Sequence, residues 1–293
     1  MLEALAASVR SVPGVRLLDV SSDPDHNRAV YTFAGAGDAV LEAAFRSAAV
    51  ALELIDLRAH EGVHPRIGAV DVIPFVPLGG ATMAACATPA RRLGERLAAQ
   101  LGLPVYLYGQ AGADPARVLA VLRRGGFEAL QAEITRPARH PDYGPARVHP
   151  TGGAVAVGAR EILIAFNVNL EGRDLAAARA IASAVRNSSG GLPAVQAMAV
   201  PLASRGCVQV SMNLQDYRRT PPLVAFQRVE AEAARRGVAV LGGELIGCAP
   251  PDALPPDPVA ALRLRSLRSE QILDPARLAR DLFGPDRPED RAR

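Results

Sequence analysis

The sequence predicts an α+β protein with two ferredoxin-like subdomains, each a βαββαβ-type unit whose antiparallel or mixed sheet carries its helices on one face. Three observations lead to this prediction. The second half of the chain alternates strand-like and helix-like segments in the order β-α-β-β-α-β. The first half gives α-β-β-α-β, the same order without its first strand. Residues 136–153 show neither periodicity and separate the two halves.

The elements of the first half follow from hydrophobic periodicity. Apolar residues at alternate positions predict strands, and apolar residues three and four positions apart predict helices. The turn-forming run Asp23–Asn27 lies between two strand-like segments and predicts a hairpin. In chain order we expect a helix Leu2–Arg10, strands Val15–Ser21 and Ala29–Ala34, a helix Gly37–Leu57, a strand Ala69–Leu78, a helix Thr88–Leu101, a strand Val105–Tyr108 and a helix Ala116–Gln131.

The second half gives the cleaner series. Its segments are a strand Ile162–Leu170, a helix Leu175–Arg186, strands Val195–Leu202 and Val208–Leu214, a helix Leu223–Arg236 and a strand Val238–Ile246. A chain of 293 residues is long enough for two domains. We therefore expect subdomains over residues 1–158 and 159–254, followed by a helical tail over 255–293 with a frayed end, DRPEDRAR.

Composition excludes several classes of function. Lys+Arg exceeds Asp+Glu by 33 to 30, too small an imbalance for a basic stripe, so we expect no nucleic-acid partner. Lysine is absent, which excludes a pyridoxal phosphate Schiff base and a phosphate-binding P-loop. The three cysteines are too far apart for a CxxC motif or a disulfide framework, and no apolar run approaches the length of a membrane span. We expect a cytoplasmic protein that does not enter membranes.

The run from His60 to Asp71 is the densest polar constellation. Its HEGVH segment matches the HExxH zinc pattern, but that pattern binds zinc on a helix, and Gly62 and Pro65 disfavour a helix here. We expect no metal site. His64 is a candidate general base because an ordinary histidine is largely neutral at pH 7; the alternative is a loop histidine bonded to backbone carbonyls.

Other polar residues of the chain are candidates for substrate contacts. Arg66 has the fork of donors that binds a carboxylate, unless it only forms an ion pair with Asp71. In the second half, polar side chains alternate with apolar ones, so one sheet face is polar and either lines a ligand cleft or meets solvent. These residues are Asn167, Asn169, Gln209, Ser211 and Asn213.

Several long stretches resemble the glutamate formiminotransferase family. They are LLDVSSDPDHNRAVYTF, HEGVHPRIGAVDVIPFVPL, PVYLYG, PDYGPARVHPTGGAVAVGAREILIAFNVNL and VQVSMNLQDY. The resemblance implies transfer of the formimino group from N-formimino-L-glutamate to N5 of tetrahydrofolate, with folate in a cleft between two α/β subdomains and usually a homodimer. His64 falls on the family's catalytic histidine. The folate-binding stretch, which without the resemblance is better taken as a flexible linker, falls on Gly144, Pro145, Ala146, Arg147, Val148, His149, Pro150, Thr151, Gly152 and Gly153.

The sequence departs from this family in three places. The family's usual first strand, with its asparagine-phenylalanine-serine-glutamate-glycine motif, is missing before Met1. Val63 replaces a glutamate beside His64, and Leu223 stands where a histidine is usual. Two alternatives therefore stay open. One is a noncatalytic folate-binding paralogue, and the other is a sister transferase with another donor, such as formiminoglycine.

Overall fold

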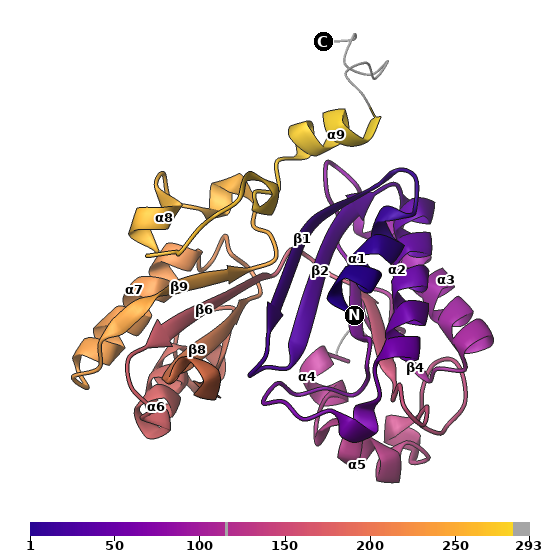
Figure 1. Ribbon diagram of the computed structural model, residues 1–293, viewed down its shortest axis with the longest axis horizontal. Helices are drawn as coiled ribbons and strands as arrows, with labels where there is room; N and C mark the ends of the chain where they lie inside the picture. Colours follow the sequence, from indigo (N-terminus) through magenta and orange to yellow (C-terminus); the bar gives the residue numbers. More distant parts are fainter. Residues whose placement is uncertain (115–116, 284–293) are drawn as a thin grey trace. The chain divides into compact units, whose positions relative to one another are not determined.

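The computed structural model describes residues 1–114 and 117–283, and the chain forms two compact units (Figure 1). Unit 1 comprises Met1–Leu17, Phe33–Glu161 and the segment from Pro275 onward. Unit 2 comprises Leu18–Thr32 and Ile162–Asp274. The units are thus discontinuous in sequence, unlike the contiguous subdomains 1–158 and 159–254 expected from the sequence. Most of a hairpin near the N-terminus belongs to the second unit.

Unit 2 has the predicted ferredoxin-like arrangement. Its four-stranded sheet has the order β7-β8-β6-β9, and every neighbouring pair is antiparallel. The first strand of the motif therefore lies between the third and the fourth, as in a split βαβ unit. The elements in chain order are β6 (Ile164–Leu170), α6 (Leu175–Val185), β7 (Val195–Leu202), β8 (Cys207–Leu214), α7 (Pro222–Ala234) and β9 (Val240–Ile246).

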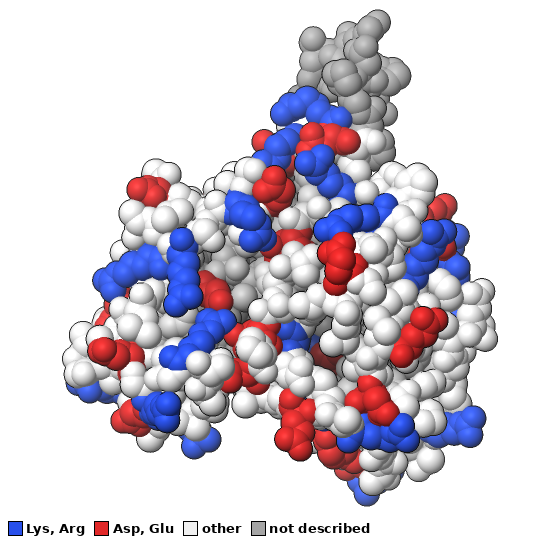
Figure 2. All heavy atoms as spheres, in the orientation of Figure 1, with Lys and Arg blue, Asp and Glu red and all other residues white. Residues whose placement is uncertain are grey.

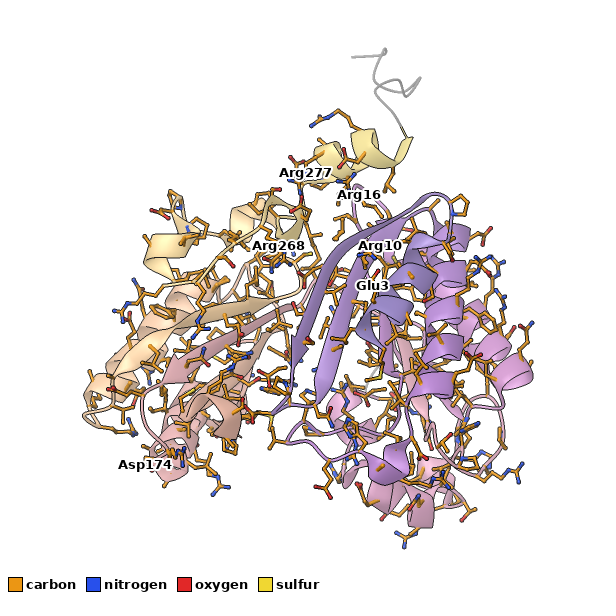
Figure 3. All side chains as sticks on the ribbon, viewed as in Figure 1. Glu3, Arg10, Arg16, Asp174, Arg268 and Arg277 are labelled. Atoms are coloured by element: carbon orange, nitrogen blue, oxygen red, sulfur yellow. The ribbon has the colours of Figure 1, made fainter. Side chains whose placement is uncertain are left out.

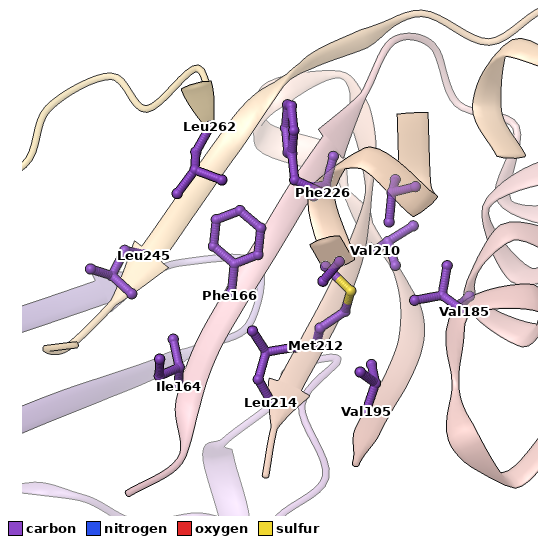
Figure 4. Packing of buried hydrophobic residues seen from close by; sticks show 14 of the residues in the cluster. Ile164, Phe166, Val185, Val195, Val210, Met212, Leu214, Phe226, Leu245 and Leu262 are labelled. Atoms are coloured by element: carbon purple, nitrogen blue, oxygen red, sulfur yellow. The ribbon is translucent and has the colours of Figure 1, made fainter. Parts of the chain in front are cut away.

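Strand parity builds the core of unit 2 (Figure 4). Phe166 and Met212 lie on the face that packs against α6 and α7, and both are almost fully buried. The Phe166 ring meets the Phe226 ring of α7 edge to face, with 6.3 Å between the ring centroids. At the start of α6, Asp174 accepts a hydrogen bond from the Ala177 N–H at 2.9 Å and caps the helix (Figure 3).

Unit 1 is α+β, and its strands do not join into the single antiparallel or mixed sheet of a βαββαβ unit. The hairpin β1 (Val15–Asp23) and β2 (Arg28–Gly35), of which residues 18–32 belong to unit 2, forms a separate two-stranded sheet. A second sheet has the order β3-β5-β4, and both of its pairs are parallel. The central strand β5 (Val155–Ala159) was not predicted; it is a short run of small buried residues that begins two positions after Gly153.

The other elements of unit 1 confirm most of the predicted positions. One prediction was wrong: the single helix expected over 116–131 is interrupted, because Gly125 and Gly126 have φ of 75° and 68°, outside the helical region. Residue 116 itself lies outside the described residues. The helices and strands are α1 (Leu2–Arg10), α2 (Gly37–Leu54), β3 (Asp71–Phe75), α3 (Met83–Leu101), β4 (Val105–Gly109), α4 (Leu119–Leu122) and α5 (Gly126–Glu133).

The C-terminal segment is helical in short pieces, as expected. It contains α8 (Pro258–Ala261) and α9 (Pro275–Phe283). Asp281 of α9 pairs with Arg16 of β1, with 3.2 Å between nitrogen and oxygen. The predicted frayed end, DRPEDRAR, lies outside the described residues.

Charged side chains of both signs intermix on the surface shown in Figure 2. All the basic groups there are arginines, because the chain has no lysine. Many form local ion pairs, such as Glu3 with Arg10 at 2.7 Å on α1 (Figure 3). Among the described helices, none has an apolar stretch long enough to cross a membrane.

Replacing Phe166 by alanine should lower the free energy of unfolding by about 3–5 kcal/mol, because the fully buried ring would leave a cavity. Urea denaturation followed by circular dichroism measures this change. Leu241→Ala is the control, since Leu241 of β9 is 55% exposed and should change stability by less than about 0.5 kcal/mol. Equal losses in the two variants would contradict the assignment of the core.

Candidate active site

The first candidate site is the loop over residues 58–66 in unit 1. No helix forms over His60–His64, which confirms the prediction and removes the geometry of a HExxH zinc motif. Within residues 1–114 and 117–283, no group of three His, Cys, Asp or Glu side chains is placed to hold a metal ion. Val63 is 40% exposed and His64 is half-buried, so the tip of the loop lies at the surface.

The start of this loop is fixed by a short 3-10 turn, Leu57–Ala59. Asp56 caps the turn by accepting a hydrogen bond from the Arg58 N–H at 3.0 Å. The buried Leu57 donates its own N–H to the Thr151 carbonyl at 2.9 Å. The loop therefore leaves from a point that is bonded directly to the predicted folate-binding stretch.

The end of the loop is held by the same stretch and by Ala154, the residue that follows it. Ile67 is fully buried, and its carbonyl accepts a hydrogen bond from the Ala154 N–H at 2.9 Å. The Ala69 N–H donates to the Gly152 carbonyl at 3.0 Å. Between these bonds, Gly68 forms a backbone bridge with Gly153, and a Cβ on Gly68 would lie 1.7 Å from the Ala154 carbonyl oxygen. Only glycine fits this contact, which we call the loop junction.

The Gly144–Gly153 stretch is an ordered turn at its C-terminal end. His149 and Gly153 exchange two backbone hydrogen bonds, each 2.9 Å long. The Gly152 N–H also donates to Nδ1 of His149 at 3.0 Å, so the proton of the neutral ring is on Nε2. At the other end, a Cβ on Gly144 would lie 2.4 Å from the Leu103 carbonyl oxygen. Both ends of the stretch therefore lie in close contact with backbone atoms, which is not typical of a flexible linker.

Arg66 is held inside unit 1. Its Nη2 donates to the His60 carbonyl at 2.9 Å and to the Glu128 carboxylate at 3.0 Å. The suggested alternative, an ion pair with Asp71, is wrong, because Asp71 accepts from the Ile67 N–H at 2.9 Å and pairs with Arg123. A contact between Arg66 and substrate stays a prediction. Glu128 and Arg123 were not predicted, because they belong to no sequence motif.

Ile67, beside the loop junction, packs in a small apolar cluster. Tyr106 belongs to it, and its hydroxyl donates to the Arg139 carbonyl at 2.6 Å. Burial raises the pKa of Tyr106 to about 12 and also raises the pKa of Tyr108. Both tyrosines are therefore neutral at physiological pH, and the junction rests on an uncharged surface.

The second candidate site is the polar face of the sheet in unit 2. The strand register pairs Asn167 with Ser211 and Asn169 with Gln209, and it places Asn213 opposite Ala165. The five predicted polar residues thus share one face. Gln209 is fully buried, and its Nε2 donates to Asn169 Oδ1 at 2.8 Å and to Glu244 Oε2 at 3.0 Å. Glu244 was not predicted as a site residue, although it lies in a predicted strand.

Gly153→Ala should separate the two sides of the loop junction. The new Cβ would lie 2.3 Å from the Ile67 carbonyl oxygen, at a residue with φ of 68°. We expect a cost of at least about 2 kcal/mol and a fall of about 4–8 °C in the midpoint of thermal unfolding. Gly80→Ala is the matched control, with φ of 84° and nothing within 4 Å of the added carbon. Equal midpoints would refute the role of the contact.

Comparison with known proteins identifies the family. Residues 1–160 match the formiminotransferase domain, N-terminal subdomain, and residues 165–256 match the formiminotransferase domain. The chain is 42% identical over 255 residues to a glutamate formimidoyltransferase of Streptococcus pyogenes serotype M1, covering 87% of this chain and 85% of that protein. It is 44% identical over 250 residues to one from Thermoplasma acidophilum, covering 84% and 82%. A formimidoyltransferase-cyclodeaminase of Mus musculus is 40% identical over 261 residues, which are 87% of this chain and 48% of that protein. The chain therefore belongs to the formiminotransferase family.

Proposed function

We propose that this protein is a glutamate formimidoyltransferase. It transfers the formimino group of N-formimino-L-glutamate to N5 of tetrahydrofolate, giving 5-formiminotetrahydrofolate and L-glutamate, a step of histidine degradation. The observation that carries the proposal is the 42–44% identity to two proteins of that name over most of the chain. The names of these two relatives do not favour the folate-binding paralogue or a transferase with another donor.

His64 is the proposed general base. N5 of tetrahydrofolate attacks the formimino carbon, a new C–N bond forms, and N5 must lose its proton. His64 is half-buried at the tip of a loop whose two ends are held by hydrogen bonds, and this position suits the proton transfer. The C–N bond to glutamate then breaks, and the leaving amine takes up a proton, for which the imidazolium of His64 is the source. His64 thus accepts the proton that N5 loses and returns it to the leaving amine, so its own protonation state is restored.

The loop junction supports a folate site next to this base. The Gly144–Gly153 stretch is bonded to both ends of the His64 loop, through Leu57 at one end and Ala69 at the other. A ligand that contacts this stretch would meet a backbone whose position is tied to that of the loop. Tetrahydrofolate is the proposed co-substrate, and no metal takes part in the proposed reaction.

The cellular setting is also proposed. Cys86, Cys207 and Cys248 are buried and form no disulfide among the described residues, which is compatible with a reducing cytoplasm. A homodimer and the absence of nucleic-acid and membrane partners are further parts of the proposal. The homodimer rests on the family resemblance alone.

His64→Ala should lower turnover by about 10²–10⁴ and leave folate binding within about twofold. The assay mixes formiminoglutamate with tetrahydrofolate and measures the absorbance of the cyclised product after acid treatment. His140→Ala is the matched control, because His140 is an exposed histidine of the same unit, and its turnover should be that of the unmodified chain. Wild-type turnover in His64→Ala would remove His64 as the base. Inactivity of the unmodified chain with formiminoglutamate would instead remove the proposed reaction.

A further inference from the structure

The polar face of unit 2 contains a group of side chains whose bonding is incomplete. In the strand register, Asn167 lies directly between Ser211 on one neighbouring strand and Glu244 on the other. We call these three residues the amide-carboxylate patch. Asn167 is 6% exposed, and its side-chain amide is not one of the fully buried polar atoms without a partner among the described residues. The amide of Asn167 therefore remains able to exchange hydrogen bonds with a ligand group at this position.

Glu244 is partly bonded and partly available. Its Oε1 accepts from Arg205 Nη1 at 3.3 Å, and its Oε2 accepts from Gln209 Nε2 at 3.0 Å. A carboxylate offers about four lone-pair positions, so each oxygen keeps capacity for one more donor. The side chain is 29% exposed. Glu244 can therefore receive two parallel N–H groups from a planar ligand.

Residues of the β1–β2 turn, together with Arg205 and Gln209, fix the orientation of the Glu244 carboxylate. Both N–H groups of the Gln209 amide point toward oxygen acceptors, so its Oε1 faces Nε2 of His26 at 3.0 Å and must accept from it. Arg205 pairs with Asp23 as well as with Glu244. Asp25 in turn accepts from the Ser204 N–H at 3.1 Å. The geometry of the patch is thus set before any ligand binds.

A planar group with two adjacent N–H donors is the chemistry that such a carboxylate recognises. Asn167 and Ser211 would supply a further donor and acceptor beside it. We propose that the amide-carboxylate patch binds an amidine group of a substrate, an inference that rests on the proposed function. Two substrates of that reaction carry this chemistry. One source is the formimidoyl group of the donor, and the other is the 2-amino-pyrimidinone edge of the folate.

Glu244→Gln tests the proposal, because it keeps the size of the side chain and removes the charge. The Michaelis constant for formiminoglutamate should be measured at saturating tetrahydrofolate, and the dissociation constant of tetrahydrofolate by calorimetry. We expect one of these constants to rise about 10-fold or more, as for loss of a charge-assisted bidentate pair. Glu230→Gln is the matched control: Glu230 is 30% exposed on α7, pairs with Arg263 at 2.5 Å, and should change neither constant.

The two sources give different results. If the formimidoyl group binds the patch, the constant for the donor rises and that for tetrahydrofolate stays within twofold. The inhibition constant of N-formylglutamate, which has oxygen in place of the amidine nitrogen, then also stays unchanged. If the pyrimidinone edge binds, the constant for tetrahydrofolate rises and that for the donor does not. Changes below twofold in both constants would overturn the proposal.

Ser211→Ala is a second test, which shows whether an effect of Glu244→Gln comes from lost binding or from damage to the sheet. Ser211 is half-buried, so removing its hydroxyl should leave the unfolding midpoint within about 2 °C and raise the same constant as Glu244→Gln by about 2–5-fold. A rise in both constants with Glu244→Gln that Ser211→Ala does not reproduce would overturn the proposal. If the unmodified chain transfers no formimino group, the proposed function fails, and calorimetry with formiminoglutamate and tetrahydrofolate separately still tests amidine binding.

Discussion

The close backbone contact between Gly68 and Gly153 is the constraint on which the candidate active site depends. Two loops that are about 85 residues apart in sequence approach so closely that a side chain on either glycine would collide with a carbonyl oxygen. The hydrogen bonds on both sides of this contact give the His64 loop fixed ends. A base at the tip of a loop can act reproducibly only if the ends of the loop are fixed, since misplacement by a fraction of an ångström weakens proton transfer.

The polar network of unit 2 is governed by a different principle. Gln209 is fully buried, and a buried amide is tolerated only when its donors and its acceptor are all satisfied. Asn169, Glu244 and His26 satisfy them together. The orientation of one amide thereby links two strands of the sheet to the hairpin turn. Rigidity here comes from complete bonding, whereas at the loop junction it comes from the lack of space.

The sequence predicted local structure well and long-range contacts poorly. Hydrophobic alternation placed β7 at Val195–Leu202, as observed, because each face of that strand meets a distinct environment. It missed β5, since a short run of small buried residues carries no alternation. His64 was predicted as a base from the polar run His60–Asp71 and from the family resemblance, and the folate role of the Gly144–Gly153 stretch was predicted from the resemblance alone. Their junction was not predicted, because backbone hydrogen bonds between distant segments leave no periodic signal. The folate cleft between the subdomains stays a prediction.

The discontinuity of the two compact units limits how the chain can be divided. Residues 18–32 belong to unit 2, while the segments on both sides of them belong to unit 1. A fragment that begins near residue 159 would contain the four-stranded sheet but not His26 or Asp23. It would expose the Oε1 of Gln209 and leave Arg205 without one of its two carboxylates. Inheritance of the second unit as an independent module would therefore require a substitute for the hairpin, which favours retention of the two units as one gene.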